Sequence, residues 1–206
     1  LTSTEIASIK TGQLSGLTTS QLVALTSNQV QALTSLQIGN LSTDQVKALT
    51  TDQVQVLTSA QVGGLTTTQL GAMTTSQVSN LTTSDVAAIK TTQLAGLTTS
   101  QVQALTTSQV QALTSAQVGA LSTDQLKALT TTQVQSLTST EIASIKTGQL
   151  SGLTTSQVQA LTTSQVQALT SAQIGNLSTD QVKALTTDQV VALTASQVGS
   201  LTTLQL

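Results

Sequence analysis

Three acid–lysine pairs are the residues of this chain whose types and spacing could do chemistry. In each pair the acid precedes the lysine by five residues, and the pairs are Glu5 and Lys10, Asp85 and Lys90, and Glu141 and Lys146. Such residues could form a local ion pair, which contributes only about 0 to 1 kcal/mol when exposed. A lysine could also form a covalent cross-link to a neighbouring chain. We predict solvated ion pairs that mark the repeat register, with no catalytic role.

The remaining composition offers little for catalysis or metal binding. The chain contains no Cys and no His, so it lacks a thiolate nucleophile, the usual neutral-pH base and the commonest metal ligand. A Ser–Lys dyad is conceivable, but nothing distinguishes one serine from the many others. The aspartates are spread along the chain, whereas calcium needs six or more oxygens in one place. We therefore expect no enzyme, no cofactor and no metal site.

The charge pattern also argues against nucleic acid and membrane partners. The net charge is -2, and the six basic residues are all lysines distributed along the chain. Binding to phosphates needs a basic patch, and stacking of bases needs aromatic side chains, which are absent here. No apolar run approaches the 18 residues that a membrane-spanning helix requires. We expect neither nucleic acid binding nor membrane insertion.

An octapeptide repeats along the whole chain without insertion or deletion. Its 206 residues divide into 25 complete octads and six further residues, with the modal sequence L-T-T-S-Q-V-Q-A at 97–104 and 105–112. Position 1 is Leu, Ile or Met, and position 6 is Val, Ile or Leu. Position 2 is Thr or Ser except at the three paired lysines, and position 5 is Gln except at the three paired acids. A fixed short period predicts one uninterrupted array over residues 1–206.

Larger blocks of octads are repeated as well. The segment 145–200 repeats the segment 89–144 octad for octad, and an earlier copy spans 9–64 with extra octads at 65–88. Each block holds seven octads, which is an odd number. A solenoid that alternates two unlike helices would exchange their roles between such copies. We therefore predict equivalent octads without a fixed two-helix alternation.

The residue types within one octad favour a short helix. A continuous helix would drift by about 80° per octad, and a strand would point positions 1 and 6 to opposite faces. With position 2 as the N-cap, position 5 becomes the third helical residue, which gives a capping box, and positions 1 and 6 form a hydrophobic staple. The predicted capping residues are Thr98 with Gln101 and Thr106 with Gln109. The predicted core residues are Leu97, Val102, Leu105 and Val110.

These signals predict an all-α solenoid, a superhelical rod built from one very short helix per octad. Its interior would be aliphatic and its exterior would carry Thr, Ser and Gln, with a β-solenoid as the alternative. Glycines at position 8, namely Gly16, Gly64, Gly96 and Gly152, predict tight corners or close backbone contact.

Tandem L-T-T-x-Q-V-x-A octads resemble stretches of very large secreted bacterial surface proteins that are described as adhesin-like. The resemblance covers the whole chain and brings no catalytic or binding residues with it. It implies an extracellular or cell-surface location and a role as a stalk or filament.

We expect a structural repeat protein that serves as an extracellular spacer, stalk or filament-forming segment. Its partners would be copies of itself, end to end or lateral, or the rest of a longer array. One alternative is a threonine-rich surface that binds ice or a polysaccharide. Another is an amyloid-like assembly with glutamine ladders.

Overall fold

Each complete octad forms one short α-helix. The computed structural model describes residues 2–205, and these residues contain 25 helices of four to six residues and no β-strand. The prediction of an all-α solenoid with one helix per octad is therefore confirmed, and the β-solenoid alternative is not supported. Within residues 2–205 no helix is long and apolar enough to cross a bilayer.

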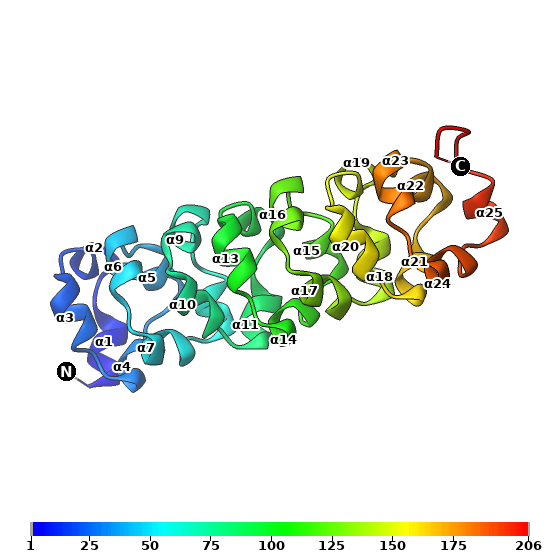
Figure 1. The fold of residues 1–206 in the computed structure, drawn as a ribbon. Coiled ribbons are helices and arrows are strands. Elements are labelled where there is room, and N and C mark those ends of the chain that lie inside the picture. The colour runs from blue at the N-terminus through cyan, green and yellow to red at the C-terminus, as the bar shows by residue number, and fades with distance from the viewer. Residues whose placement is uncertain (1, 206) are drawn as a thin grey trace. The chain divides into compact units, whose positions relative to one another are not determined.

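The chain forms two compact units, Leu1–Leu105 and Thr106–Leu206, although the octad pattern has no break at this point. The helices, labelled in Figure 1, have the following bounds. Unit 1 contains α1 (Ser3–Ser8), α2 (Thr11–Leu14), α3 (Thr19–Val23), α4 (Ser27–Gln31), α5 (Ser35–Gly39), α6 (Thr43–Ala48), α7 (Thr51–Gln55), α8 (Ser59–Val62), α9 (Thr67–Ala72), α10 (Thr75–Ser79), α11 (Thr83–Ala88), α12 (Thr91–Leu94) and α13 (Thr99–Ala104). Unit 2 contains α14 (Thr107–Gln111), α15 (Ser115–Val118), α16 (Thr123–Ala128), α17 (Thr131–Ser136), α18 (Ser139–Ser144), α19 (Thr147–Leu150), α20 (Thr155–Ala160), α21 (Thr163–Ala168), α22 (Ser171–Gly175), α23 (Thr179–Lys183), α24 (Thr187–Val191) and α25 (Ala195–Val198).

Two to four residues separate one helix from the next, and the last of them, the N-cap, is extended, as the pair between α20 and α21 shows. Leu161, which follows α20, has φ −59° and ψ 139°, and Thr162, the N-cap of α21, has φ −72° and ψ 158°. The β-branched threonine suits this extended backbone better than a helix interior. No residue within 2–205 has a positive φ, glycines included. The helices therefore end without the left-handed residue that commonly closes a helix.

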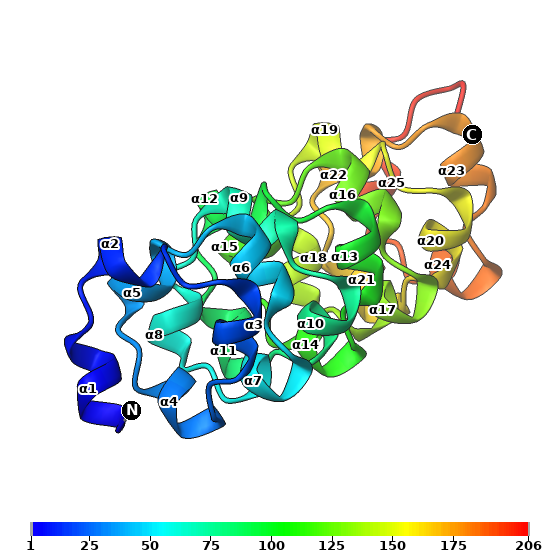
Figure 2. The same ribbon diagram turned by 90° about the vertical axis from the view of Figure 1, so that its left-hand side faces the viewer.

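Each helix packs against the helix three octads away. In unit 1, α8 contacts α11 and α10 contacts α13; in unit 2, α18 contacts both α15 and α21. Figure 2 shows α8 beside α11. Because a step of three octads pairs odd-numbered with even-numbered helices, the octads share one role and no two-helix alternation arises. Helices too short to persist alone are held by this packing.

Positions 1 and 6 of the octad form the core. Leu97 and Leu105 are at most 6% exposed, and Val102 and Val110 are fully buried. The glutamine at position 5 is buried too, with Gln101 only 2% exposed. The expected glutamine exterior is therefore wrong for position 5, whereas Thr, Ser and the position 7 glutamines do lie outside.

Glycine at position 8 allows close approach of the helix three octads earlier. A Cβ added at Gly64 would lie 2.6 Å from the carbonyl oxygen of Ser35, and one at Gly96 or Gly152 would overlap Thr67 or Thr123. The expectation of close backbone contact is therefore correct for these three glycines. All four glycines also lie in turns, where each backbone N–H donates to the carbonyl three residues earlier, so the expectation of tight corners is correct although no described glycine has a positive φ. A Cβ at Gly16 would meet only the Gln13 carbonyl, at 3.3 Å.

Gly64→Ala should destabilise the protein by about 1–3 kcal/mol, because the new methyl group collides with the backbone of Ser35. Gly148→Ala is the matched control, since a Cβ there has no neighbour within 4 Å. Gly148 lies inside α19, so alanine should stabilise by about 0.5–1 kcal/mol. Urea unfolding measures both changes. Equal effects of the two substitutions would show that close packing at position 8 is unimportant.

Candidate functional site

The capping box is formed by reciprocal hydrogen bonds within each octad. The backbone N–H of Gln101 donates to Thr98 Oγ1 at 3.2 Å, and the backbone N–H of Thr98 donates to Gln101 Oε1 at 2.7 Å. Thr106 and Gln109 make the same two bonds at 3.2 and 2.8 Å. The first N–H groups of a helix lack intrahelical partners. The threonine and the glutamine together satisfy two of them in octads of this type.

The same glutamine amide also reaches an earlier turn of the solenoid. Gln101 Nε2 donates to the carbonyl oxygens of Leu70 at 3.0 Å, Gly71 at 3.3 Å and Met73 at 2.6 Å. Leu70 and Gly71 lie in the last turn of α9, where carbonyl groups lack the intrahelical N–H donors found further inside a helix. One side chain therefore caps the start of its own helix and the end of another helix four octads earlier.

This glutamine bridge recurs with fixed sequence offsets in both units. Gln77 in unit 1 and Gln157 in unit 2 each donate to carbonyls 28, 30 and 31 residues earlier. Only one orientation of the amide fits, because Oε1 faces an N–H group and Nε2 faces carbonyl oxygens. Helices pack three octads apart and the bridge spans four, so one superhelical turn takes between three and four octads.

The three acids at position 5 perform only the capping half of this role. Glu5, Asp85 and Glu141 each accept the backbone N–H of the threonine three residues earlier, at 2.7, 3.0 and 2.7 Å. Asp85 also accepts the hydroxyl of Ser59 at 3.1 Å. Asp85 and Glu141 are at most 6% exposed. A carboxylate has no N–H to donate, so these octads lack the glutamine bridge to the earlier turn.

The lysines paired with these acids occupy N-cap positions and are exposed. Lys10, Lys90 and Lys146 precede α2, α12 and α19. An ammonium group has no lone pair to accept an N–H, so only the glutamine half of the capping box can form. The backbone N–H of Lys90 donates to Gln93 Oε1 at 2.6 Å. The acids take their hydrogen bonds from threonine and serine, and the ion pairs with lysine stay a prediction.

Hydrogen bonding perturbs the acid nearest the start of the chain. The backbone N–H and then the hydroxyl of Thr2 lower the pKa of Glu5 below its ordinary value. A lowered pKa in the folded state means that ionised Glu5 contributes stability above its unfolded pKa. This contribution is lost as the pH falls through the folded pKa.

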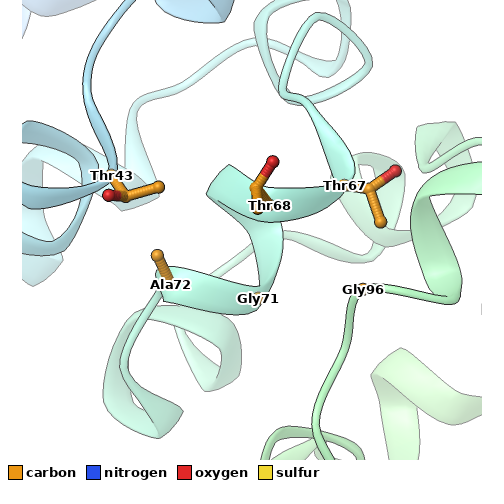
Figure 3. A pocket seen from close by; sticks show the side chains of 6 residues that line it. All are labelled: Thr43, Thr67, Thr68, Gly71, Ala72 and Gly96. Carbon is orange, nitrogen blue, oxygen red and sulfur yellow. The ribbon is translucent and has the colours of Figure 1, made fainter.

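A shallow hollow of about 500 Å³ lies on unit 1 and has an uncharged lining. Figure 3 shows its lining residues, which are Thr43, Thr67, Thr68, Gly71, Ala72 and Gly96. They come from α6, from α9 and from the residues after α12. The hollow offers hydroxyl groups and no ionisable side chain. Within residues 2–205 no three acids come together as a metal site would require.

Comparison with protein families identifies the repeat. A family model described as the ALTTAQ repeat matches residues 6–43, 31–59, 39–67, 55–83, 78–115, 110–139, 142–179 and 174–203. These eight matches overlap and tile nearly the whole chain. The chain belongs to the ALTTAQ repeat family. A search of curated proteins finds no match.

The bridging role of the glutamine is the feature of this ALTTAQ array that the sequence reasoning missed. The spacing predicted the capping bond of Gln101 but not its second set of bonds. A signal was present, because a capping box accepts either Glu or Gln at this position. Glutamine fills position 5 in all but three octads, and only an amide provides both an acceptor and a donor.

Gln101→Glu should destabilise the ALTTAQ array by about 1–3 kcal/mol, because the capping acceptor remains while the donor to Leu70 and Met73 is lost. Gln21→Glu is the matched control. Gln21 caps its own helix but is exposed, so its change should stay within about 0.5 kcal/mol. Urea unfolding measures both. Similar losses in the two variants would contradict the bridge.

The reverse change should strengthen the array. Glu141→Gln supplies an amide donor in register with the carbonyls of Val110 and Leu113, 31 and 28 residues earlier. We expect a gain of about 1 kcal/mol, measured as an increase in the urea midpoint. Glu5→Gln, at an exposed position, should give no comparable gain. A gain of the same size at Glu5 would assign the effect to charge removal alone.

Proposed function

We propose that this chain is a structural spacer, a segment of an extracellular stalk or filament on a bacterial surface. The observation that carries the proposal is the glutamine bridge. Most octads supply their own helix cap and bonds to an earlier turn, as at Thr98 and Gln101. Such an array gains length by adding octads, with no new type of contact required.

The chemistry of the outer positions also supports a spacer. Positions 2, 3, 4 and 7 of the octad are mostly Thr, Ser and Gln and mostly exposed, and only 7% of the chain is charged. A surface of this kind is hydrated without attracting strongly charged ligands. The extracellular location rests on the resemblance to adhesin-like repeats. Antibody labelling of intact cells that carry the protein tests that location.

Two deletions of equal size test the spacer role. Removing 145–200 or removing 89–144 takes out seven whole octads and preserves the register. In a spacer, both deletions should shorten the maximum dimension by the same length, in proportion to the octads removed, because every octad adds an equivalent step. Small-angle scattering of the monomer measures this dimension, and circular dichroism checks that the helix content per residue is unchanged. Unequal shortening, or shortening out of proportion to the octads removed, would contradict the spacer role.

A further inference from the structure

Glu141 carries a buried carboxyl group that uses only one of its two oxygen atoms. Its Oε2 accepts the backbone N–H of Thr138 at 2.7 Å, and the side chain is 6% exposed. Among the described residues no group donates a hydrogen bond to its Oε1. The carbonyl oxygen of Leu113, a residue that is 3% exposed, also receives no hydrogen bond from residues 2–205. Both oxygen atoms therefore lack a donor.

The glutamine octads of unit 2 show that these two oxygen atoms face each other. Gln157 accepts a backbone N–H through Oε1 at 2.8 Å and donates through Nε2 to the Leu129 carbonyl, 28 residues earlier, at 2.7 Å. Glu141 makes the same cap with a side chain of the same length, and α18 packs on α15 in the same way. Leu113 lies 28 residues before Glu141. Oε1 of Glu141 therefore takes the place of the amide nitrogen, opposite the Leu113 carbonyl.

The duplicated block contains the same contact with an amide in place of the acid. Position 197 is equivalent to position 141, because the segment 145–200 repeats the segment 89–144. Gln197 caps its own helix and donates to the carbonyl of Leu169, 28 residues earlier, at 2.7 Å. The chain thus presents one contact between turns in two forms, with a donor at Gln197 and without one at Glu141.

A proton on Glu141 supplies the missing donor. A neutral carboxyl group has one O–H donor and one acceptor in the planar arrangement of an amide, whereas a carboxylate has acceptors only. An O–H···O bond spans about 2.5–3.0 Å, which includes the 2.7 Å that Gln157 spans to the Leu129 carbonyl. We propose that Glu141 is a proton-binding site that switches one bridge between turns. With a proton bound, its Oε1–H donates to the Leu113 carbonyl, and loss of the proton leaves only the cap.

No other titratable group faces this site from the helices around it. The helices α15 and α21 pack against α18, and α14 precedes Leu113. All three contain only Thr, Ser, Ala, Gln and Val. Lys146 is the next charged residue along the chain, and it is exposed and stays protonated in neutral and acidic solution. A pH dependence of this contact therefore belongs to Glu141.

Asp85 is equally buried but has no use for a proton. Its side chain is one methylene shorter, and both of its oxygen atoms accept hydrogen bonds. Oδ2 accepts the backbone N–H and the hydroxyl of Thr82 at 3.0 and 2.6 Å, and Oδ1 accepts the hydroxyl of Ser59 at 3.1 Å. A proton on Asp85 would displace one of these donors. Protonation therefore completes a hydrogen bond at Glu141 and removes one at Asp85.

Unfolding of the wild type and of Glu141→Gln at several pH values tests the proton site. At about pH 7 only the variant has the bridge, so its unfolding equilibrium constant should be about fivefold lower. The wild-type bridge needs a bound proton, so the stability that it adds is present at low pH and is lost as the pH rises. At about pH 3 the difference should fall below about twofold. Urea unfolding measures both constants, and the comparison cancels the carboxyl groups that the two chains share.

Asp85→Asn is the matched control, because it should show a pH effect of the opposite sign. At about pH 7 the wild type should be more stable than this variant, since the carboxylate accepts three hydrogen bonds. Acid should then lower the stability of the wild type relative to Asp85→Asn and raise it relative to Glu141→Gln. A pH effect of the same sign in both comparisons would assign the result to charge removal and overturn the proposal.

The proton itself can be observed by NMR. Glu5 and Glu141 are the only glutamates of the chain, so isotope labelling of glutamate gives two side-chain carboxyl signals, and Glu141→Gln assigns them. As the pH falls, the Glu141 signal should change before that of Glu5, whose ionised form is favoured by hydrogen bonds from Thr2. A Glu141 signal that changes with or after that of Glu5 would overturn the proposal, as would an equal advantage of Glu141→Gln at both pH values. These results are independent of the spacer role, which the deletions test through length.

Discussion

The structure depends on the side-chain amide of the position 5 glutamine, whose oxygen binds at the start of one helix and whose nitrogen binds at the end of another. A helix of four to six residues leaves most of its N–H and C=O groups without intrahelical partners, so an array of such helices is rich in unpaired backbone groups. Gln101 accepts an N–H at the start of its own helix and donates to carbonyls at the end of α9. An unpaired buried polar group costs about 1–3 kcal/mol, so this double use makes very short helices tolerable in a core.

Packing and hydrogen bonding then define the same superhelix. The small residue at position 8 allows a helix to approach the one three octads earlier, as Gly64 approaches Ser35. The position 5 glutamine forms hydrogen bonds up to four octads earlier. Leucine and valine at positions 1 and 6 fill the interior. The helix packing therefore spans three octads, and the glutamine bridge spans four.

The acids at position 5 show which part of the glutamine's role another residue can replace. Glu5, Asp85 and Glu141 retain the capping bond and lose the donor, and a lysine that cannot cap follows each of them in the next octad. Weakened caps and missing bridges therefore occur together, at three places related by duplication. A carboxylate substitutes for an amide only where a single acceptor is needed.

The sequence alone determined the octad, its helix, its caps and its aliphatic core. These follow from local rules, since an N-cap threonine, a third-residue glutamine and a staple of Leu97 with Val102 act within eight residues. The pairing of helices three octads apart and the burial of Gln101 were decided by the tertiary structure. Both features depend on the rotation between successive octads. The sequence of a single octad does not specify this rotation, which is set by the packing of one turn on the next. A carbonyl 28 residues away becomes the partner of a glutamine only after the superhelix has closed one turn.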